Sequence, residues 1–568
     1  MAKMTAAELL AHARGWLAED PDPGTRDELA ALLDAADGGG ADALAELGDR
    51  FDGTLQFGTA GLRGELGAGS MRMNRVVVIR AAAGLAAYLK AQGARDGLVV
   101  IGYDARHKSY DFARDTAAVM TGAGLRAALL PSPLPTPVLA YAIRHLGAAA
   151  GVMVTASHNP PQDNGYKVYL GDGSQIVPPA DAEIAAEIAA VGSLADVPRP
   201  DSGWQVLGDE VLEAYLARAA SVVTPGGPRD ISIVYTPMHG VGLGTAMAAF
   251  ARAGFPAPTA VAEQAEPDPE FPTVAFPNPE EPGAMDLAFK WAQSANPDIV
   301  IANDPDADRC AVAVPDRTAP TGWRMLRGDE LGALLAVHLV RGGSAKRGQD
   351  VFAASIVSSS LLSKIAARAG LGYEDTLTGF KWIARVEGLR YGYEEALGYC
   401  VDPGGVRDKD GITAALLVAE LAASLKRESR TLTDLLDDLA LDHGLHATDQ
   451  LSARVADLSL IADAMARLRA HPPTVLAGLP VTSAEDLAEG SGDLPPTDGL
   501  RYHLTGTATS GVTSARVIAR PSGTEPKLKC YLEVVVPAPA PADLPPARTT
   551  ASRVLSALKT DLAAAAGI

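Results

Sequence analysis

Hydrophobic residues recur along this chain in two patterns. Short runs rich in β-branched residues, typical of buried strands, are followed by longer alanine-rich stretches with the spacing of amphipathic helices. The clearest strand candidates are residues 98–102, 151–154, 231–234, 298–301 and 350–353. The clearest helix candidates are residues 77–91, 180–190 and 329–340. Strands and helices that alternate in this way predict a mostly parallel α/β architecture.

The C-terminal part of the chain has a different pattern. Two β-rich runs, residues 515–520 and 528–536, flank a turn, and we expect the Pro/Ala-rich segment 537–547 to be an exposed connector. The pattern predicts three similar mixed α/β units followed by a smaller α+β domain. Pro- and Gly-bearing stretches and a change near Ala440 serve as candidate boundaries. They place the domains at residues 1–204, 205–322, 323–443 and 444–568.

Length and composition fit a folded protein of several domains. The chain has 568 residues, more than the roughly 250–300 that one hydrophobic core supports, and 47% of them are hydrophobic. No run of about 18 uncharged apolar residues occurs, and residues 1–20 resemble a surface helix instead of a signal peptide. The three widely spaced cysteines predict neither a disulfide framework nor a zinc site. We therefore expect a cytoplasmic protein with no membrane contact.

The net charge of −20, from 49 basic and 69 acidic residues, argues against a general nucleic-acid surface. It does not exclude anionic small molecules, because a local cationic cleft can bind them within an acidic protein.

The segment Thr155-Ala-Ser-His-Asn-Pro160 directly follows one of the predicted strands. A strand that ends in such a loop presents the Ser157 hydroxyl to a substrate, although the same residues are also typical of an ordinary turn. Neighbouring side chains on an extended segment point in opposite directions. We therefore expect His158 to orient the loop and not to act on Ser157 as a base.

Three aspartates alternate in the segment Asn303-Asp-Pro-Asp-Ala-Asp-Arg309. In an extended loop their side chains would converge, so Asp304, Asp306 and Asp308 would offer three hard oxygen ligands. An EF-hand calcium loop requires Gly at its sixth position and Glu at its twelfth, where this chain has Arg309 and Pro315. A magnesium site and a solvated acidic turn are the two remaining interpretations.

Near the C-terminus, the segment Arg520-Pro-Ser-Gly-Thr-Glu-Pro-Lys527 has the composition of a phosphate-binding loop. Gly523 allows backbone N–H groups to turn inward, Ser522 and Thr524 add hydroxyl donors, and Arg520 supplies a planar fork of donors. The alternative is a hairpin turn whose charges are incidental.

Together and in this order, these motifs resemble the α-D-phosphohexomutase superfamily, the phosphoglucomutase/phosphomannomutase group. The resemblance extends from Phe57-Gly-Thr-Ala-Gly-Leu-Arg-Gly64 to the Ser-Gly-Thr loop. The opening motif and Tyr235-Thr-Pro-Met-His-Gly-Val-Gly242 are similar to the branch that includes eukaryotic phosphoglucomutase 2. Thr378-Gly-Phe-Lys381 and Glu394-Glu-Ala-Leu-Gly398 resemble the family's sugar-recognition segments.

The resemblance implies four domains around a central cleft, and a mutase that carries a phosphoryl group on Ser157. One Mg²⁺ per chain would be held by Asp304, Asp306, Asp308 and the phosphate on Ser157. Glucose 1,6-bisphosphate would serve as intermediate and activator. Lys167 and Arg63 match catalytic positions, where each either assists proton transfer or neutralises phosphate. The implied substrate contacts are Arg309, Thr378, Gly379, Lys381, Glu394, Glu395, Arg520, Ser522, Gly523 and Thr524.

The sugar-recognition segment departs from the family pattern at two positions. Leu397 stands where many members have a serine, and Tyr399 stands where certain bacterial phosphomannomutase/phosphoglucomutases have a histidine. Relative to those members, the segment therefore lacks one side chain that could hydrogen-bond to the sugar. Pentose phosphates thus remain possible substrates.

The sequence thus predicts a phosphosugar mutase, of the isomerase class, that interconverts glucose 1-phosphate and glucose 6-phosphate. Phosphopentomutase or phosphomannomutase activity is the alternative within the class, and a metal-dependent phosphatase or a non-catalytic sugar-phosphate sensor is the alternative outside it. The expected partners are small sugar phosphates, with no nucleic acid, and the expected state is a monomer or homodimer.

Overall fold

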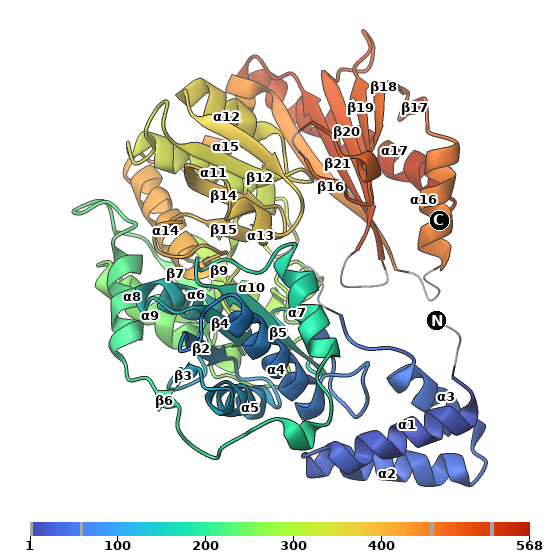
Figure 1. The fold of residues 1–568 in the computed structure, drawn as a ribbon. Helices are drawn as coiled ribbons and strands as arrows, with labels where there is room; N and C mark the ends of the chain where they lie inside the picture. The colour runs from blue at the N-terminus through green and yellow to red at the C-terminus, as the bar shows by residue number, and fades with distance from the viewer. Residues whose placement is uncertain (1–3, 57–60, 455–458, 493, 523–526) are drawn as a thin grey trace. The chain divides into compact units, whose positions relative to one another are not determined.

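The computed structural model describes residues 4–56, 61–454, 459–492, 494–522 and 527–568 (Figure 1). The chain divides into two compact units. The first comprises Met1–Pro225, Asp230–Arg324 and Asp402–Leu416, and the second comprises Gly226–Arg229, Met325–Val401 and Leu417–Ile568. Within the described residues, the strands form four sheets.

Three helices precede the first sheet and form a small bundle, drawn in dark blue in Figure 1. They are α1 (Ala6–Glu19), α2 (Pro23–Asp37) and α3 (Ala41–Phe51). The bundle has its own apolar core, in which Leu29, Leu47 and Phe51 are buried. Local signals start the first two helices: Thr5 caps α1 reciprocally with Glu8, and Asp22 caps α2. The hydrophobic pattern predicted only the first of the three.

The first sheet has the strand order β1-β5-β4-β2-β3-β6. Its strands are β1 (Leu62–Glu65), β2 (Leu98–Tyr103), β3 (Arg126–Leu129), β4 (Ala150–Val154), β5 (Asp163–Leu170) and β6 (Gln205–Val206). The helices around it are α4 (Arg75–Ala91), α5 (Ser109–Gly122), α6 (Thr136–His145) and α7 (Ala180–Ala189), with the 3₁₀ turn η1 (Leu194–Asp196). The central strands run parallel, but β4 and β5 are antiparallel neighbours. A short loop between them therefore lies at one edge of the sheet.

The second sheet repeats this arrangement in the order β11-β10-β9-β7-β8. Its strands are β7 (Ile233–Thr236), β8 (Thr259–Ala260), β9 (Ile299–Ala302), β10 (Ala311–Pro315) and β11 (Trp323–Met325). Its helical segments are α8 (Glu210–Ala220), α9 (Gly242–Arg252), η2 (Ala262–Gln264) and α10 (Asp286–Ala295). Here too an antiparallel pair, β9 and β10, adjoins parallel strands. Strand β7 begins two residues later than the sequence pattern predicts.

The third sheet has the order β13-β12-β14-β15. Its strands are β12 (Val351–Ser355), β13 (Gly372–Thr376), β14 (Leu389–Glu394) and β15 (Gly398–Cys400). The helices of this region are α11 (Gly328–Arg341), α12 (Leu361–Ala369), α13 (Phe380–Ile383), α14 (Gly411–Arg427) and α15 (Leu432–His443).

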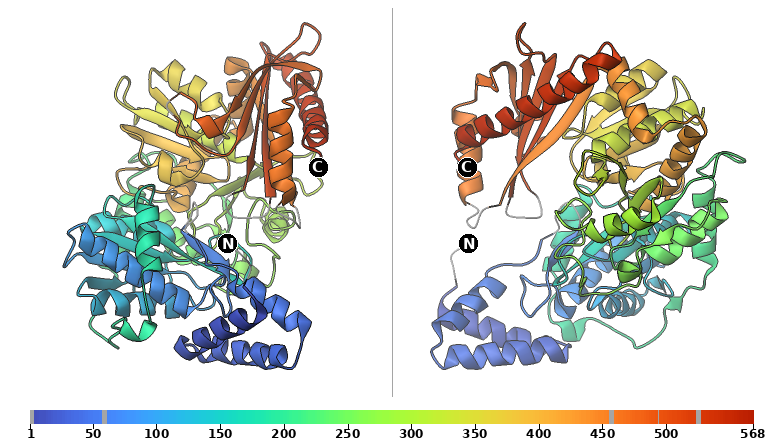
Figure 2. Two further views of the ribbon diagram at one scale, coloured as in Figure 1. Left: turned by 45° about the vertical axis from the view of Figure 1, so that its right-hand side comes forward. Right: turned by 180° about the vertical axis from the view of Figure 1, so that it is seen from behind.

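The fourth sheet is antiparallel, with the order β16-β21-β20-β19-β18-β17. Its strands are β16 (Leu445–Arg454), β17 (Val475–Leu476), β18 (Leu479–Asp486), β19 (Leu500–Thr505), β20 (Ser514–Pro521) and β21 (Lys527–Val536). Its helical segments are α16 (Ser459–Ala470), η3 (Leu487–Glu489), η4 (Pro541–Asp543) and α17 (Leu544–Ala566). Helices α16 and α17 pack on one face of the sheet (Figure 2). Outside that helix-covered core, Ile518 on β20 and Tyr531 on β21 are buried in a separate apolar cluster with Ile356 and Val357.

The expected connector at 537–547 is shorter than predicted. Helix α17 begins at Leu544, and Leu544 and Ala547 are buried in the core of the fourth domain. The prolines that follow Leu544 lie in the first helical turn, where a missing N–H costs nothing. The prediction of an exposed connector is wrong for these last residues, because Pro at the start of a helix looks like a helix breaker.

Three cysteines that form no disulfide are buried in three different regions of the fold. Cys310 immediately precedes β10, Cys400 lies in β15 and Cys530 lies in β21. Burial raises the pKa of the Cys530 thiol to about 12, so it is protonated at neutral pH.

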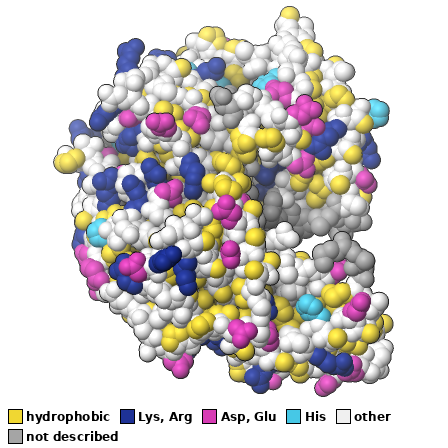
Figure 3. Space-filling model, viewed as in Figure 1, with side chains coloured by type: hydrophobic (Ala, Val, Ile, Leu, Met, Phe, Trp, Pro, Cys, Tyr) yellow, Lys and Arg dark blue, Asp and Glu magenta, His cyan; other side chains and the backbone are white. Residues whose placement is uncertain are grey.

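Hydrophobic side chains on the visible surface are scattered among charges of both signs (Figure 3). The large exposed ones come from separate segments: Tyr110, Val206, Leu460, Val475 and Ile568. Among the described residues, no helix combines the length and apolar composition that a membrane span requires.

Candidate active site

The segment around Ser157 forms the tight loop that joins the antiparallel strands β4 and β5. Ser157 is 3% exposed and has a left-handed backbone, with φ 51°. Its N–H donates to Thr155 Oγ1 at 2.9 Å. A non-glycine residue in this conformation is costly unless its surroundings enforce it, and such residues gather at functional sites.

The left-handed turn also changes the position of His158. Its Nδ1 lies 3.1 Å from Ser157 Oγ. The expectation that the two side chains point apart is therefore wrong, because it assumed an extended backbone. Ser157 Oγ donates its hydrogen to Asp304 Oδ2 at 2.7 Å. His158 and Asp304 thus both contact the same hydroxyl.

The three aspartates lie in the loop that joins the antiparallel strands β9 and β10. The loop is a compact turn instead of the extended segment assumed from the sequence, because Ala307 is left-handed with φ 54°. The neighbouring segment supports it: Val241 N–H donates to Pro305 O at 2.8 Å, and the glycine before it packs directly against Pro305. The turn brings the carboxylates together by a different geometry from the one predicted.

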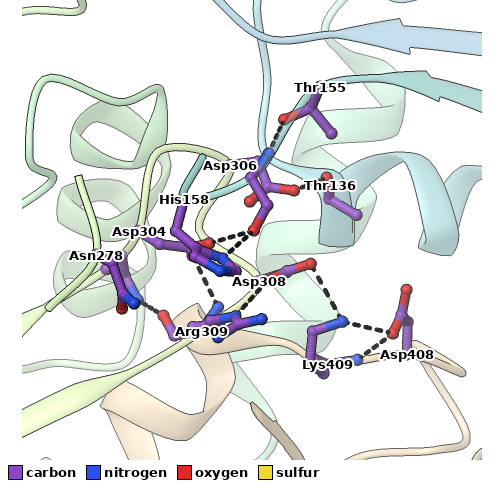
Figure 4. Close-up of polar contacts among 12 residues, drawn as sticks. Thr136, Thr155, His158, Asn278, Asp304, Asp306, Asp308, Arg309, Asp408 and Lys409 are labelled. Carbon is purple, nitrogen blue, oxygen red and sulfur yellow. Dashed lines mark hydrogen bonds and ion pairs between the residues drawn. The ribbon is translucent and has the colours of Figure 1, made fainter. Parts of the chain in front are cut away.

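Asp304, Asp306 and Asp308 are fully buried, and one oxygen from each lies within 4.8 Å of the others. Figure 4 shows the three side chains converging from one loop. Thr136, at the start of α6, donates its hydroxyl to Asp306 Oδ2 at 2.6 Å. The second oxygens of Asp306 and Asp308 are buried and have no hydrogen-bond partner. Three hard oxygen donors with unsatisfied buried atoms fit the requirements of a magnesium ion.

Cationic side chains balance this charge. Lys167 on β5 lies 2.8 Å from Asp306 Oδ2 and 2.9 Å from Asp308 Oδ2. Lys409 lies 3.2 Å from Asp308 Oδ2, and Arg309 Nε lies 3.9 Å from Asp308 Oδ1 (Figure 4). Three cations therefore face three carboxylates in a region closed to solvent.

Burial and neighbouring charges move the pKa values of these groups in different directions. Burial raises the pKa of Asp304, and the charges of Asp306 and Asp308 raise it further. Burial acts in the same sense on Asp308, but Lys167, Lys409 and Arg309 outweigh it and hold its pKa well below the usual range. Burial alone would lower the pKa of Lys167, whereas Asp306 and Asp308 raise it above its ordinary value. These ion pairs therefore favour the protonated form of Lys167.

Arg63 on β1 reaches the serine loop. Its Nη1 donates to Asn159 Oδ1 at 3.1 Å, and its Nε is buried without a partner. Burial lowers the pKa of its guanidinium, which remains charged. The rest of its motif, residues 57–60, lies outside the described residues.

The remaining predicted contacts belong to the second compact unit. Thr378 is half-buried, and Gly379 N–H donates to Glu394 Oε1 at 2.7 Å. Gly379 has φ 111°, a conformation that other residues rarely adopt. Lys381 is buried, with its ammonium 5.7 Å from the centre of the Trp382 ring. The two sugar-recognition segments are thus in contact.

Glu395 accepts hydrogen bonds at Oε2 from Ser355 Oγ at 3.1 Å and Ser358 Oγ at 3.2 Å. Burial raises its pKa to about 7, with a further contribution from the charge of Glu394. Its carboxyl therefore changes charge near neutral pH.

Of the predicted phosphate loop, Arg520 and Ser522 lie in the part of the chain that the structure describes, and Gly523 and Thr524 lie outside it. Arg520 is on β20, directly opposite Lys529 on β21. Opposite residues of an antiparallel pair lie on the same face of the sheet, so both cations belong to one face. Ser522 N–H donates to Lys527 O at 2.8 Å and closes the base of the loop.

The two positions that depart from the family pattern lie in the core. Leu397 is 1% exposed with φ 64°. Tyr399 is fully buried, stacks on Tyr393 and donates its hydroxyl to Gly328 O at 3.0 Å. Neither side chain is placed to reach a sugar.

Family models match three successive parts of the chain. They describe phosphoglucomutase/phosphomannomutase α/β/α domain I at residues 54–194, domain II at 213–317 and domain III at 327–441. The chain belongs to the phosphoglucomutase/phosphomannomutase family. The chain is therefore an enzyme of the mutase class. Its fold of three α/β units and a fourth domain confirms the architecture predicted from the sequence.

Relatives of this chain carry names with different sugars. A protein of Haemophilus influenzae named "Probable phosphomannomutase" is 50% identical, over 83% of this chain and 95% of that protein. Phosphopentomutase of Mus musculus is 36% identical, over 92% and 89%. Phosphoglucomutase of Staphylococcus epidermidis is 34% identical, over 85% and 91%. In fold, the chain is similar to the phosphoglucomutase parafusin from Paramecium, with TM-score 0.66, 17% identity and coverage of 90% of this chain and 95% of that one.

Sequence reasoning missed two residues of the candidate active site. Lys409 contacts Asp308, and Thr136 contacts Asp306. For Lys409 a signal was present, because Arg407-Asp-Lys-Asp410 places four charged residues directly before the apolar helix α14. Thr136 looks like an ordinary helix start, and nothing in its local sequence marks it.

Proposed function

We propose that this enzyme interconverts glucose 1-phosphate and glucose 6-phosphate through a phosphorylated Ser157. The observation that carries the proposal is the hydrogen bond of 2.7 Å from Ser157 Oγ to Asp304, one of three buried, converging carboxylates. A protein that only binds a sugar phosphate does not need a buried serine hydroxyl beside three carboxylates. A serine that carries a phosphoryl group during the reaction does need this arrangement.

The buried aspartates supply the donor set for one Mg²⁺. Asp304, Asp306 and Asp308 would hold the ion, together with an oxygen of the phosphate on Ser157. When bound, the cation would stabilise negative charge on the phosphoryl group in transit. Lys167, Lys409 and Arg309 contribute positive charge from this chain's own side chains.

The proposed reaction has two matched halves. In the first, the free hydroxyl oxygen of the sugar monophosphate bonds to the phosphorus on Ser157, the bond from phosphorus to Oγ breaks, and the proton of the sugar hydroxyl ends on Oγ. The products are glucose 1,6-bisphosphate and the free serine. In the second half, Ser157 Oγ bonds to the phosphorus of the other phosphate, the bond from that phosphorus to the sugar oxygen breaks, and the proton of the serine hydroxyl ends on the sugar oxygen. The two halves therefore release no net proton.

Residues of the second unit would hold the sugar phosphate. Arg520 and Ser522, with Gly523 and Thr524, would bind the phosphate that is not being transferred. Glu394, Glu395, Thr378, Gly379 and Lys381 would contact the sugar. Arg63 would keep its charge beside the serine loop.

Ribose 1-phosphate and ribose 5-phosphate are a second candidate pair. Buried Leu397 offers no hydroxyl where many family members have a serine, which weakens recognition of a particular hexose. The 36% identity to a mouse phosphopentomutase over nearly the whole chain supports this candidate. Mannose phosphates are the third candidate, because the Haemophilus influenzae relative is named a probable phosphomannomutase.

The test is an assay of purified protein with Mg²⁺, a trace of glucose 1,6-bisphosphate and glucose 1-phosphate, followed by detection of glucose 6-phosphate. Ser157→Ala is the inactive variant. Ser294→Ala is its control, because the Ser294 hydroxyl only bonds to a carbonyl of its own exposed helix. We expect turnover in the wild type and control and none in Ser157→Ala.

Parallel assays with mannose 1-phosphate and ribose 1-phosphate rank kcat/KM for the three sugars. A higher value for ribose or mannose would replace the glucose assignment. Release of inorganic phosphate without an isomerised sugar would instead indicate a phosphatase.

A further inference from the structure

Arg106, between β2 and α5, holds the main chain of the serine loop. Its side chain is 1% exposed. Nη1 donates to Pro160 O at 2.6 Å and to Asp163 O at 3.1 Å, and Nη2 donates to Ser157 O at 2.7 Å and to Asn159 O. One guanidinium therefore binds four carbonyl oxygens of the loop that carries Ser157.

Only arginine can make this set of contacts. Its planar group presents five N–H donors in a fixed fork, whereas a lysine ammonium has three donors at one point. The charge is compensated by Asp104, whose Oδ2 lies 3.5 Å from Arg106 Nε, and the guanidinium lies 4.8 Å from the centre of the Phe271 ring. Asp104 Oδ1 also accepts from Arg106 N–H at 3.0 Å and from Ser109 Oγ at 2.6 Å.

The residues next to Arg106 anchor its segment to other parts of the first unit. His107 Nε2 lies 2.5 Å from Glu270 Oε1, and His107 O accepts from Asn164 Nδ2 at 2.8 Å. Lys108 Nζ lies 2.7 Å from Asp22 Oδ2, at the start of α2. The backbone segment that carries Arg106 is thus anchored by contacts that His107 and Lys108 make outside the serine loop.

We propose that Arg106 is a positioning residue that fixes the serine loop so that Ser157 Oγ is presented for phosphoryl transfer. The inference rests on the proposed function of Ser157. The left-handed backbone at Ser157 requires support from its surroundings, and Arg106 binds the carbonyl of that same residue. A misplacement of about 1 Å at a reacting group costs on the order of 100-fold in rate.

The kinetic test compares Arg106→Lys with the wild type. Arg75→Lys is the control, because Arg75 also makes a bidentate pair, with Asp115 at 2.7 Å, away from the serine loop. We expect Arg106→Lys to lower kcat by about 100-fold, with KM changed by less than about threefold, and Arg75→Lys to leave both near wild type. An unchanged kcat, or a raised KM at unchanged kcat, would overturn the proposal.

Two further measurements separate positioning from a general loss of structure. Millimolar guanidinium should restore part of the kcat of Arg106→Ala, whereas methylammonium should not, because only the planar ion reproduces the donor fork. Amide hydrogen exchange at residues 155–163 should be faster in Arg106→Lys than in the wild type or Arg75→Lys. Equal exchange rates would overturn the proposal. The exchange measurement decides the role of Arg106 even if the wild type turns over none of the sugar phosphates, a result that would refute only the proposed function.

Discussion

At the scale of single residues, the balance of charge around Asp308 explains how three carboxylates can be buried together. An isolated buried carboxylate is strongly destabilising. Here Lys167 and Lys409 lie 2.9 and 3.2 Å from the same oxygen, Asp308 Oδ2. The pKa of Asp308 is accordingly depressed, so the group stays ionised and available as a ligand.

Replacing Asp308 by Asn should strongly weaken the binding of Mg²⁺. The amide removes one anionic ligand and leaves Lys167 and Lys409 with less compensation. We expect Mg²⁺ affinity, measured by calorimetric titration, to fall by at least about 100-fold, a loss that even outer partners of metal ligands can cause. Asp316→Asn is the control, because the Asp316 carboxylate accepts hydrogen bonds from Thr318 in an exposed turn. Equal affinity in the two variants would refute the ligand assignment.

Glu395 predicts a pH dependence of stability. Folding raises its pKa from 4.5 to about 7, so between these values the folded protein binds more protons than the unfolded chain. The stability that Glu395 contributes is complete below about pH 4.5 and is lost as the pH rises from there through about 7, by about 3 kcal/mol in all.

Glu395→Gln removes this titration. The difference in Tm between the variant and the wild type should move in the variant's favour from pH 5 to pH 8. Glu374→Gln, on the neighbouring strand β13 where Glu374 is exposed, should show a constant difference. A constant difference for Glu395→Gln as well would contradict the raised pKa.

At the scale of elements, the loop of Ser157 and the loop of the three aspartates each connect two antiparallel strands that adjoin parallel ones. The Ser157 loop joins β4 to β5, and the aspartate loop joins β9 to β10. The packing behind the second loop leaves no room for a side chain at Gly240. A Cβ built there would lie 2.3 Å from Pro305 Cα. The loop that carries Asp304, Asp306 and Asp308 therefore depends on a glycine in a different segment.

We predict that Gly240→Ala displaces the aspartate loop, destabilises the protein by about 1–3 kcal/mol through overpacking and weakens Mg²⁺ binding. Gly244→Ala, in helix α9, is the matched control. A Cβ at Gly244 meets nothing within 4 Å, so this variant should gain about 0.5–1 kcal/mol from helix propensity. Urea unfolding and Mg²⁺ titration distinguish the two. Similar behaviour of both variants would disprove the close packing.

The sequence predicted elements and local motifs better than it predicted geometry. Strands such as β2, β4 and β12 and helix α4 were readable, because their hydrophobic pattern is local. The turn at Ser157 could not be predicted, since a serine in the sequence does not indicate a left-handed backbone in the way that a glycine does. Lys409 was missed because its partner Asp308 is distant in sequence, and only folding brings the two together.

At the scale of the whole molecule, the predicted site residues are divided between the two compact units. The first contains Ser157 and the three aspartates, and the second contains Glu395 and Arg520. The unit that would bind the metal is therefore distinct from the unit that would bind the sugar and its phosphate. Ligands of each kind should then stabilise different parts of the chain.

Magnesium should stabilise the first unit selectively. A ligand at 100 times its Kd contributes about 2.7 kcal/mol to the state that binds it. In scanning calorimetry, Mg²⁺ should raise the melting temperature of the transition that belongs to the first unit, and excess EDTA should reverse the effect. Asp308→Asn should show no response. An equal shift in Asp308→Asn would mean that Mg²⁺ acts elsewhere on the protein.

The reaction of the three buried thiols with an alkylating reagent would measure how often each surrounding region of this enzyme opens. Cys310, Cys400 and Cys530 are each closed to solvent and lie beside the second, third and fourth sheets in turn. An alkylating reagent reaches such a thiol only when the surrounding structure opens. The three cysteine-containing peptides differ in mass, so one timed labelling experiment would follow three regions of the unmodified protein at once.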